Sequence, residues 1–175
     1  MASVAREFSE FLEAHEKDIF SFCMYLAMSK DDAEELYQDT ILAAVESMDK
    51  IDKARNPKAF VFSLAAGKWK NMRRKALRRG AVSSSVDVAE LREIPGNDDI
   101  EAAALSSLLR KEISEALRRL DDKFRIPIIL CYFDEYSIDE IGEICKIPSG
   151  TVKSRLHKGR IILRQELEKG GHSGI

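Results

Sequence analysis

Hydrophobic residues in the N-terminal segment recur at the spacing of one face of an α-helix. Relative to the first of them they fall at i+3, i+4, i+7, i+11, i+14 and i+18, and they are Phe8, Phe11, Leu12, His15, Ile19, Phe22 and Leu26. This periodicity predicts an amphipathic helix. Ser29 followed by Asp32 resembles a capping box, with Asp in place of the usual Glu, and predicts that a second helix begins there.

The second predicted helix has an apolar stripe and an acidic face. The inward stripe consists of Ala33, Leu36, Thr40, Ile41, Ala44 and Met48, and the opposite face carries Asp32, Glu35, Asp39 and Glu46. Leu42 falls on the acidic face. An exposed leucine among carboxylates suggests a partner surface, and a plain solvated face is about equally consistent with the pattern.

The segment NPKAFVFSLAAGKWKNMRRKALRR predicts a third helix, which Asn56 caps and Pro57 starts. Its first turns are apolar nearly all round, whereas residues 68–79 are basic and contain no acid. We therefore expect the helix to enter the core at its start and to emerge as a cationic rod. Trp69 is open to two interpretations, a core position or a stacking surface for a base.

The pattern of the C-terminal half predicts helices, because no segment alternates apolar and polar residues as a strand would. Asn97 is a candidate cap for a long helix, and Asp121 or Asp122 for a short one that runs through Cys131. The apolar positions of the long helix are Ile100, Ala104, Leu108, Ile113, Leu117 and Leu120. The chain is therefore predicted to be all-α.

A helix, a turn and a second helix end this half. In SIDEIGEICKI, Ser137 and Glu140 have capping-box spacing. After the turn, a narrow inward stripe is formed by Val152, Leu156, Gly159 and Leu163. The basic residues of this last helix are left on its outside.

The distribution of charge and of residues that interrupt helices divides the chain into two small helical domains. Gly80, three serines and Pro95 with Gly96 surround a stretch rich in Asp and Glu, which we interpret as a flexible acidic linker over residues 81–96. The domains then span residues 1–80 and 97–170. The second basic cluster, residues 146–164, also contains no acid.

Composition excludes several classes of protein. The chain is 45% hydrophobic and 33% charged, with a net charge of -2, which argues against a protein that coats nucleic acid indiscriminately. It has neither an apolar run long enough to span a membrane nor a secretory signal, so we expect a cytoplasmic protein without membrane insertion. Cys23, Cys131 and Cys145 are odd in number and widely spaced, which favours buried free thiols over disulfides or a zinc site.

The basic stretch IPSGTVKSRLHKGR is typical of a helix that enters a DNA major groove. Small and polar groups at its start are followed by outward cations, which hold phosphates while neighbouring side chains reach base edges. A solvated basic helix is the alternative interpretation of this motif by itself.

Three motifs in order resemble the extracytoplasmic-function group of bacterial sigma factors. YSIDEIGEICKIPSGTVKSRLHKGRIILRQEL resembles its second DNA-binding region, region four. DDAEELYQDTIL is similar to the core-polymerase-binding helix of region two, and NPKAFVFSLAAGKWKNMRRK to its promoter-melting helix. The resemblance covers residues 5–168 and implies a transcription initiation factor that directs core RNA polymerase to promoters and helps to open the duplex.

The resemblance also implies roles for individual residues. Those implied to bind the clamp helices of core RNA polymerase are Asp32, Glu35, Leu36, Gln38, Asp39 and Leu42. A loop from Lys50 to Lys58 and the helix after it are implied to capture the -10 element, through Lys50, Asp52, Arg55, Asn56, Lys58, Phe60, Lys68, Lys70, Asn71 and Arg74. Those implied to read the -35 element are Ser149, Thr151, Lys153, Ser154, Arg155, His157 and Lys158.

The chain departs from the family pattern at a few positions. Family members often carry Trp at the position of Phe60, Asn at that of Gly67 and Asp at that of Asn71, which bears on base preference at the -10 element. Lys146 stands at a turn position where glycine is common, so we expect a mildly unfavourable backbone conformation there.

Two alternatives were weighed against a sigma factor. A helix-turn-helix regulator that binds duplex DNA without polymerase would use the same recognition helix. A helical carboxylate-metal enzyme is disfavoured because no Glu-x-x-His pair occurs. We predict no catalytic residue, metal or cofactor. Free basic surfaces and a flexible linker also lead us to expect an inhibitory anti-sigma factor as a partner.

Overall fold

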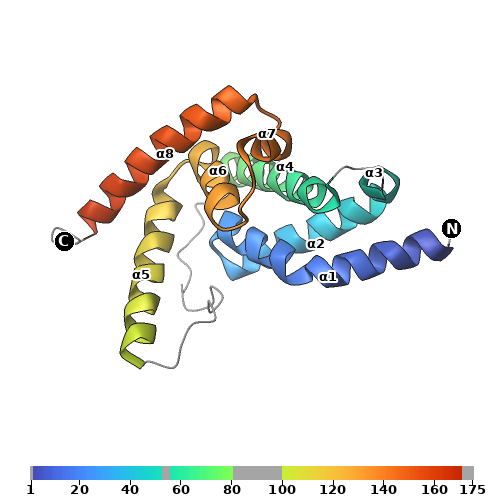
Figure 1. Ribbon diagram of the computed structural model, residues 1–175, viewed down its shortest axis with the longest axis horizontal. Helices are drawn as coiled ribbons and strands as arrows, with labels where there is room; N and C mark the ends of the chain where they lie inside the picture. The colour runs from blue at the N-terminus through green and yellow to red at the C-terminus, as the bar shows by residue number, and fades with distance from the viewer. Residues whose placement is uncertain (1, 53–55, 81–99, 171–175) are drawn as a thin grey trace. The chain divides into compact units, whose positions relative to one another are not determined.

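The computed structural model describes residues 2–52, 56–80 and 100–170, with side chains for residues 6–51, 56–80 and 108–170, and every described element is a helix (Figure 1). The helices are α1 (Ala2–Ala27), α2 (Lys30–Glu46), α3 (Met48–Asp52), α4 (Pro57–Arg78), α5 (Ile100–Arg119), α6 (Asp122–Tyr132), α7 (Ile138–Cys145) and α8 (Ser149–Lys169). The all-α prediction is confirmed. The acidic linker over 81–96 and the cap at Asn97 lie outside the described residues.

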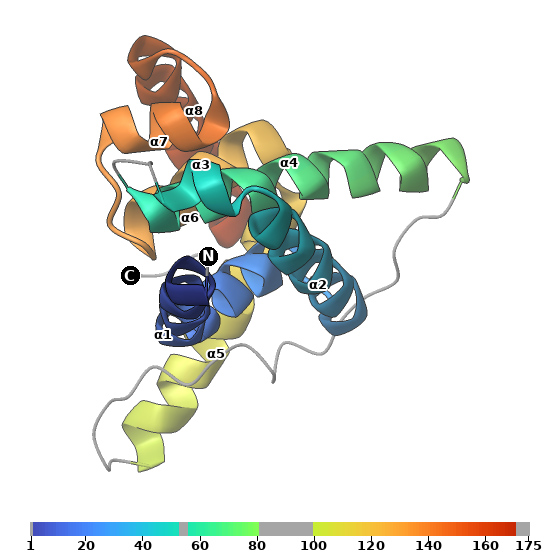
Figure 2. The ribbon, with the colours of Figure 1, turned by 90° about the vertical axis from the view of Figure 1, so that its right-hand side faces the viewer.

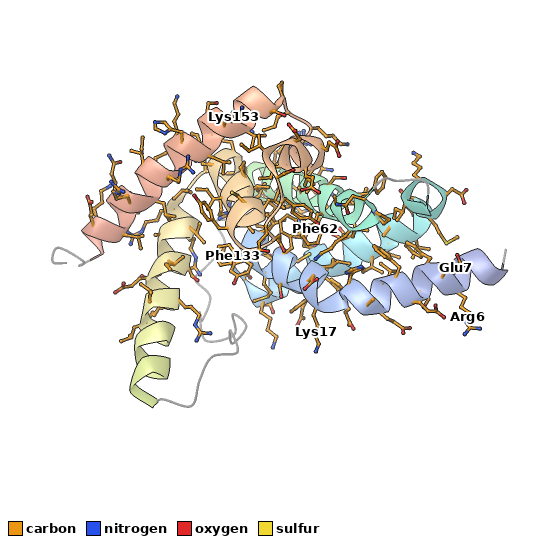
Figure 3. All side chains as sticks on the ribbon, viewed as in Figure 1. Arg6, Glu7, Lys17, Phe62, Phe133 and Lys153 are labelled. Atoms are coloured by element: carbon orange, nitrogen blue, oxygen red, sulfur yellow. The ribbon has the colours of Figure 1, made fainter. Side chains whose placement is uncertain are left out.

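The helices form two compact units, and α1 to α4 build the first. In this unit α1 packs against α2 and α4, while α2 also packs against α4. Its centre is an aromatic stack of Phe22 from α1 on Phe62 from α4, with ring centroids 4.4 Å apart and planes 3° apart. Both side chains are buried, and Phe62 is labelled in Figure 3. Each such buried side chain contributes about 1.5–3 kcal/mol.

Side-chain caps begin α2 and α4 where the sequence predicted them. Ser29 accepts a hydrogen bond from the Asp32 backbone N–H at 3.4 Å. Asn56 accepts one from the Ala59 N–H at 3.0 Å, with Pro57 in the first helical turn. Each cap satisfies a backbone donor that the first turn of a helix leaves without a partner.

A short helix, α3, replaces part of the loop that was expected between Lys50 and Lys58. Ile51 is buried, and its N–H donates to the carbonyl of Ser47 at 3.0 Å. The burial of this one apolar side chain holds the turn of helix in place.

The fourth helix is divided along its length. Its buried residues are Ala59, Val61, Phe62, Ala65, Ala66 and Trp69, and none of its residues after Trp69 is buried. Figure 2 shows the second half of α4 projecting beyond α2. The predicted cationic rod is confirmed, and Trp69, with 4% of its surface exposed, occupies a core position.

The second unit contains α5, α6 and α8, with α7 starting from it at Ile138. Both α5 and α6 pack against α8. Residues 125–130 of α6 are all buried, and Gly159 of α8 allows α6 to approach closely, since a Cβ added there would lie 2.6 Å from Cδ1 of Ile128. Leu108 of α5, expected to face inward, is 61% exposed, while among the described side chains of this helix Ser114, Ala116 and Leu117 are buried.

The three cysteines are free thiols. Cys23 and Cys145 are buried, as predicted, whereas Cys131 is only half-buried. Burial raises the pKa of the Cys23 thiol to about 12, although a hydrogen bond with Thr40 opposes the shift. Cys23 is therefore an unreactive part of the core.

Candidate partner and nucleic-acid surfaces

The outer face of α2 combines carboxylates with exposed aliphatic side chains. Glu35 and Gln38 are exposed, whereas Asp32 and Asp39 are half-buried. Leu42 is 63% exposed, and Val45, three residues further along the helix, is 52% exposed. The sequence reasoning missed Val45, although its spacing from Leu42 places the two side chains on neighbouring turns of one face.

Leu36 does not belong to this face. Its side chain is completely buried, in agreement with the apolar stripe predicted for the helix. The resemblance had also implied a contact between Leu36 and core polymerase. The structure corrects that assignment, because a side chain that packs in the core is not available to a partner.

The residues predicted at the -10 surface begin on α3. Lys50 is exposed, and Asp52 ends the short helix. The side chains of Asp52 and Arg55 lie outside those the structure describes.

Asn56 and Lys58 are engaged within the protein. The Asn56 side chain forms the α4 cap. The Lys58 ammonium donates to Asp18 of α1 at 2.8 Å and lies 5.6 Å from the centroid of the Phe62 ring. Lys58 therefore ties the start of α4 to α1.

Further along α4, the predicted residues emerge from the core. Phe60 and Lys68 are half-buried, while Lys70, Asn71 and Arg74 are exposed. The Asn71 side-chain oxygen accepts a short hydrogen bond from Nη2 of Arg74. This contact orients the Arg74 guanidinium. Asn71, at a position where family members often carry Asp, therefore positions a neighbouring cation.

The helix-turn-helix is assembled by local hydrogen bonds. At the start of α7 the Ser137 N–H donates to Glu140 at 2.8 Å and the Glu140 N–H donates to the Ser137 hydroxyl at 3.3 Å, which is the predicted capping box. In the turn, Lys146 has φ 56°, a left-handed conformation that favours glycine. The expected unfavourable backbone conformation at Lys146 is confirmed.

Helix α8 is two-sided. Val152, Leu156 and Gly159 are buried, whereas Lys153, Ser154, His157 and Lys158 are exposed and Ser149, Thr151 and Arg155 are half-buried. Figure 3 shows Lys153 on the outer side of α8. Leu163, the last residue of the predicted stripe, is half-buried.

Two serine hydroxyls on α8 donate to other groups of the protein. Ser149 donates to Oδ1 of Asp139, in the first turn of α7, at 2.6 Å. Ser154 donates to the backbone carbonyl of Thr151 at 3.0 Å. The first bond joins the beginnings of the two helices of the helix-turn-helix.

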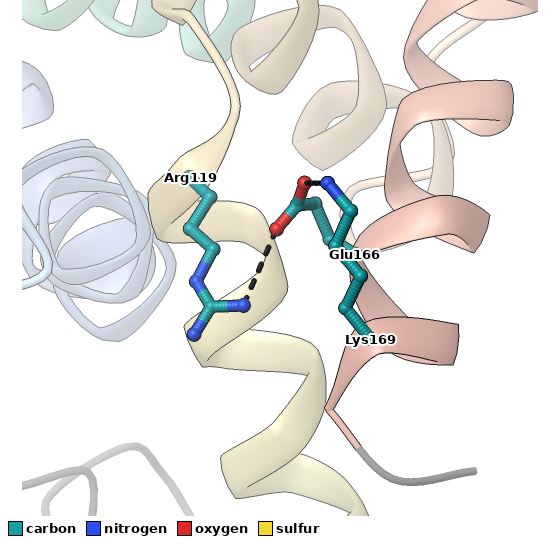
Figure 4. A network of polar contacts seen from close by, with 3 residues as sticks. All are labelled: Arg119, Glu166 and Lys169. Carbon is teal, nitrogen blue, oxygen red and sulfur yellow. Dashed lines mark hydrogen bonds and ion pairs between the residues drawn. The ribbon is translucent and has the colours of Figure 1, made fainter. Parts of the chain in front are cut away.

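Polar contacts also anchor the far part of α8. Glu166 accepts from Lys169 at 2.8 Å and from Arg119 of α5 at 3.2 Å (Figure 4). The hydrogen bonds from Lys169 and Arg119 lower the pKa of the Glu166 carboxyl. Nearer the middle of the helix, Arg160 donates to the Tyr132 hydroxyl at 3.1 Å. Helix α8 is thus attached to both α5 and α6.

The described residues also bear on two other classes of function. Among them no group of three or more His, Cys, Asp or Glu side chains is placed to hold a metal ion. Within the same residues, none of the helices has the length and apolar character needed to cross a bilayer.

Comparison with known families matches both halves of the chain. Residues 11–79 match the family of sigma-70 region 2, and residues 110–163 match that of sigma-70 region 4. The chain is 28% identical over 173 residues to the ECF RNA polymerase sigma factor SigW of Bacillus subtilis, covering 91% of this chain and 88% of SigW. It is 32% identical over 160 residues to the ECF RNA polymerase sigma factor SigL of Mycobacterium tuberculosis, again covering 91% and 88%.

Solved structures agree. The sigma factor RpoE of Bartonella quintana, crystallised in complex with the anti-sigma factor NepR, superposes with a TM-score of 0.76 at 26% identity, over 93% of this chain and 98% of that one. CnrH, solved with the cytosolic domain of CnrY, shares the fold, with a TM-score of 0.66 at 20% identity over 94% and 90%. Because both sigma regions match in order and SigL is matched over nearly its full length, this chain belongs to the ECF RNA polymerase sigma factors, the non-catalytic initiation factors that direct RNA polymerase to promoters.

Proposed function

We propose that this sigma factor divides its work among three surfaces. The outer face of α2 binds core RNA polymerase, the α3 and α4 surface captures and helps to open the -10 element, and α8 reads the -35 element as duplex. RNA synthesis is left to the polymerase, and the protein acts together with it in the cytoplasm.

The chemistry of the α2 face supports the first assignment. Glu35 and Gln38 are exposed around Leu42 and Val45. Two exposed aliphatic side chains bounded by polar groups are suited to an apolar partner patch with a basic rim. The partner assigned to this face is the pair of clamp helices of the largest polymerase subunit.

The projecting half of α4 supports the second assignment. Lys70 and Arg74 are exposed on a helix whose other end is fixed in the core. Cations held on a rigid helix bind DNA phosphates and so contribute affinity. Such contacts distinguish little between base sequences. Half-buried Phe60, nearer the start of the helix, is positioned to offer an aromatic edge to an unpaired base.

The observation that carries the proposal is the two-sidedness of α8. One stripe of this helix is buried in the second unit, while its basic outer side is exposed from its first turns onward. A recognition helix needs this arrangement, because it must be fixed from behind while its N-terminal residues enter the major groove.

An anti-sigma factor is the proposed regulator. RpoE of Bartonella quintana, which is 26% identical to this chain over nearly its whole length, was crystallised with one. The exposed aliphatic face of α2 gives such an inhibitor a surface on which to compete with polymerase.

Transcription in vitro tests the proposal. Purified core polymerase, with and without this protein, is supplied with fragmented genomic DNA of the host, and the start sites are mapped. Discrete starts that appear only with both components support it. If no new starts appear and the protein binds duplex DNA tightly by itself, it acts as an autonomous helix-turn-helix regulator.

A further inference from the structure

The DNA-facing side of α8 contains two hydroxyl groups whose protons are already used inside the protein. Ser149 donates to the Asp139 carboxylate and Ser154 to the backbone carbonyl of Thr151. A serine hydroxyl has one proton to donate and two lone pairs with which to accept. As long as these two bonds hold, both hydroxyls can only accept hydrogen bonds from DNA.

The two hydrogen bonds differ in strength. Ser154 bonds to a neutral carbonyl at 3.0 Å, a contact that exchanges readily for another partner. Ser149 bonds to a charged carboxylate at 2.6 Å, within the range of short, charge-assisted bonds. Asp139 therefore fixes the direction of the Ser149 proton, and at this place adds a second acceptor oxygen.

The groups that DNA presents to such a pair differ sharply. Phosphate oxygens, guanine N7 and O6, and thymine O4 are all acceptors and find no donor there. Adenine N6 and cytosine N4 are donors in the major groove, so both match the acceptor pair. The Ser149 and Asp139 oxygens therefore distinguish adenine and cytosine, which present amino groups, from guanine and thymine, which present keto groups, on the strand that they face.

We propose that Asp139 is a specificity-determining residue of the -35 surface, which by accepting the Ser149 proton selects adenine or cytosine at one position of the upstream element. The inference rests on the proposed function of α8. The donors of the same surface, Lys153 and Lys158, take the phosphates, so the two kinds of contact do not compete.

Three variants of the full-length protein test the inference. Asp139→Asn removes the charge and replaces one acceptor oxygen with an NH2 donor, which weakens the hold on the Ser149 proton and gives the site a donor. Ser149→Ala removes the hydroxyl and leaves the carboxylate. Glu143→Gln is the matched control, because Glu143 is an exposed acid on the same helix and its loss changes the charge by the same amount.

Each protein is combined with core polymerase, and initiation is measured on a wild-type promoter and on a panel with every base substituted at every upstream position. With the wild-type protein, one position should favour A or C over G or T by about fivefold or more, the size expected when one base-edge hydrogen bond is lost. Asp139→Asn should reduce this ratio to roughly twofold or less at that position only, while Glu143→Gln leaves it unchanged.

Different failures have different meanings. If the wild-type holoenzyme initiates but shows no amino-over-keto position, or if Asp139→Asn and Glu143→Gln have the same profile, the inference is wrong and the proposed function stands. A loss spread evenly over all positions in Asp139→Asn, with a parallel loss in Ser149→Ala, would show that the bond only holds the turn together, which also overturns it. If the wild-type holoenzyme does not initiate at all, the proposed function fails first.

Discussion

Helices α4 and α8 are nearly equal in length, at 22 and 21 residues, and both carry a long basic stretch, yet they partition that charge differently. In α4 the division runs along the axis, with a buried first half and a projecting cationic second half. In α8 the division runs around the axis, with Val152 and Gly159 buried behind exposed Lys153 and Lys158. The first arrangement suits capture of a flexible strand by charge, and the second suits a fixed surface that reads a duplex.

The starts of the two helices also differ in the contacts that hold them. Helix α4 begins with a side-chain cap from Asn56, inside the domain and beside the Lys58–Asp18 ion pair. Helix α8 has Pro148 at its cap position, which forms no side-chain cap bond, and is held by Ser149 and Asp139 instead. The start of α4 serves the fold, whereas the start of α8 is the part that is proposed to enter the groove.

The largest expected effect comes from breaking the anchor of α4. Phe62→Ala removes one ring of the stack with Phe22 and should lower the free energy of unfolding of the first unit by about 3–5 kcal/mol. Trp69, the one tryptophan of the chain, is buried in that unit, so its fluorescence during urea titration follows the loss.

Ile129→Ala in α6 is the counterpart, with Ile129 fully buried in the second unit. It should lower the stability measured by far-ultraviolet circular dichroism and leave the Trp69 transition in place. An equal shift of both signals by both variants would mean that the two units unfold as one.

The close approach of α6 to α8 gives the next effect. Gly159→Val forces atoms into the space of Ile128, which is itself buried, and should destabilise the second unit by about 2 kcal/mol. The measurement is again urea unfolding followed by circular dichroism. Gly67→Ala is the control on α4, where an added Cβ meets nothing within 4 Å, and it should be neutral or stabilising.

The basic residues on the outer side of α8 allow the proposed roles of α8 and α2 to be separated. Replacing both Lys153 and Lys158 with alanine should weaken binding of the holoenzyme to upstream duplex by roughly tenfold and reduce the log–log salt slope by about 2, since two phosphate contacts are lost. Binding to core polymerase should be unaffected, because that contact is assigned to α2. Equal loss of both activities would show that the surface is misassigned or the domain unfolded.

The same pair of changes on α4, at Lys70 and Arg74, gives the comparison. It should slow strand opening, measured by permanganate reactivity of unpaired thymines, and leave upstream duplex binding near its original value. An identical pattern from both pairs would mean that α4 and α8 do not divide the work.

The smallest expected effect lies in the turn between α7 and α8. Lys146→Gly relieves a left-handed backbone conformation and should stabilise the protein by about 1 kcal/mol. Thermal unfolding with and without the change measures the gain. Glu143→Gly, placed in α7 where glycine is unfavourable, should shift stability by a similar amount in the opposite direction.

Local patterns predicted much of this molecule. The caps at Ser29, Asn56 and Ser137, the buried start of α4 and the inward stripe of α8 all depend on residues within a few turns of one another. Such features follow from helical spacing and the hydrogen-bonding needs of helix ends, which a sequence displays directly.

Features that depend on distant partners were not predictable in the same way. The Lys58 contact joins residues 40 positions apart, and it gives a predicted DNA-binding side chain a structural partner. Periodicity placed Leu108 on an apolar face, but its side chain is 61% exposed. Similarly, α3 depends on the burial of Ile51.

Gly159 has a consequence for engineering. Because the Ile128 side chain of α6 packs against α8 there, a helix transplanted from another sigma factor without a glycine at the same register would force either Ile128 or the helix itself to move. A shift of the helix would change the position of every side chain on its outer side. We therefore expect the promoter preference of such hybrids to depend partly on a residue on the buried side of α8.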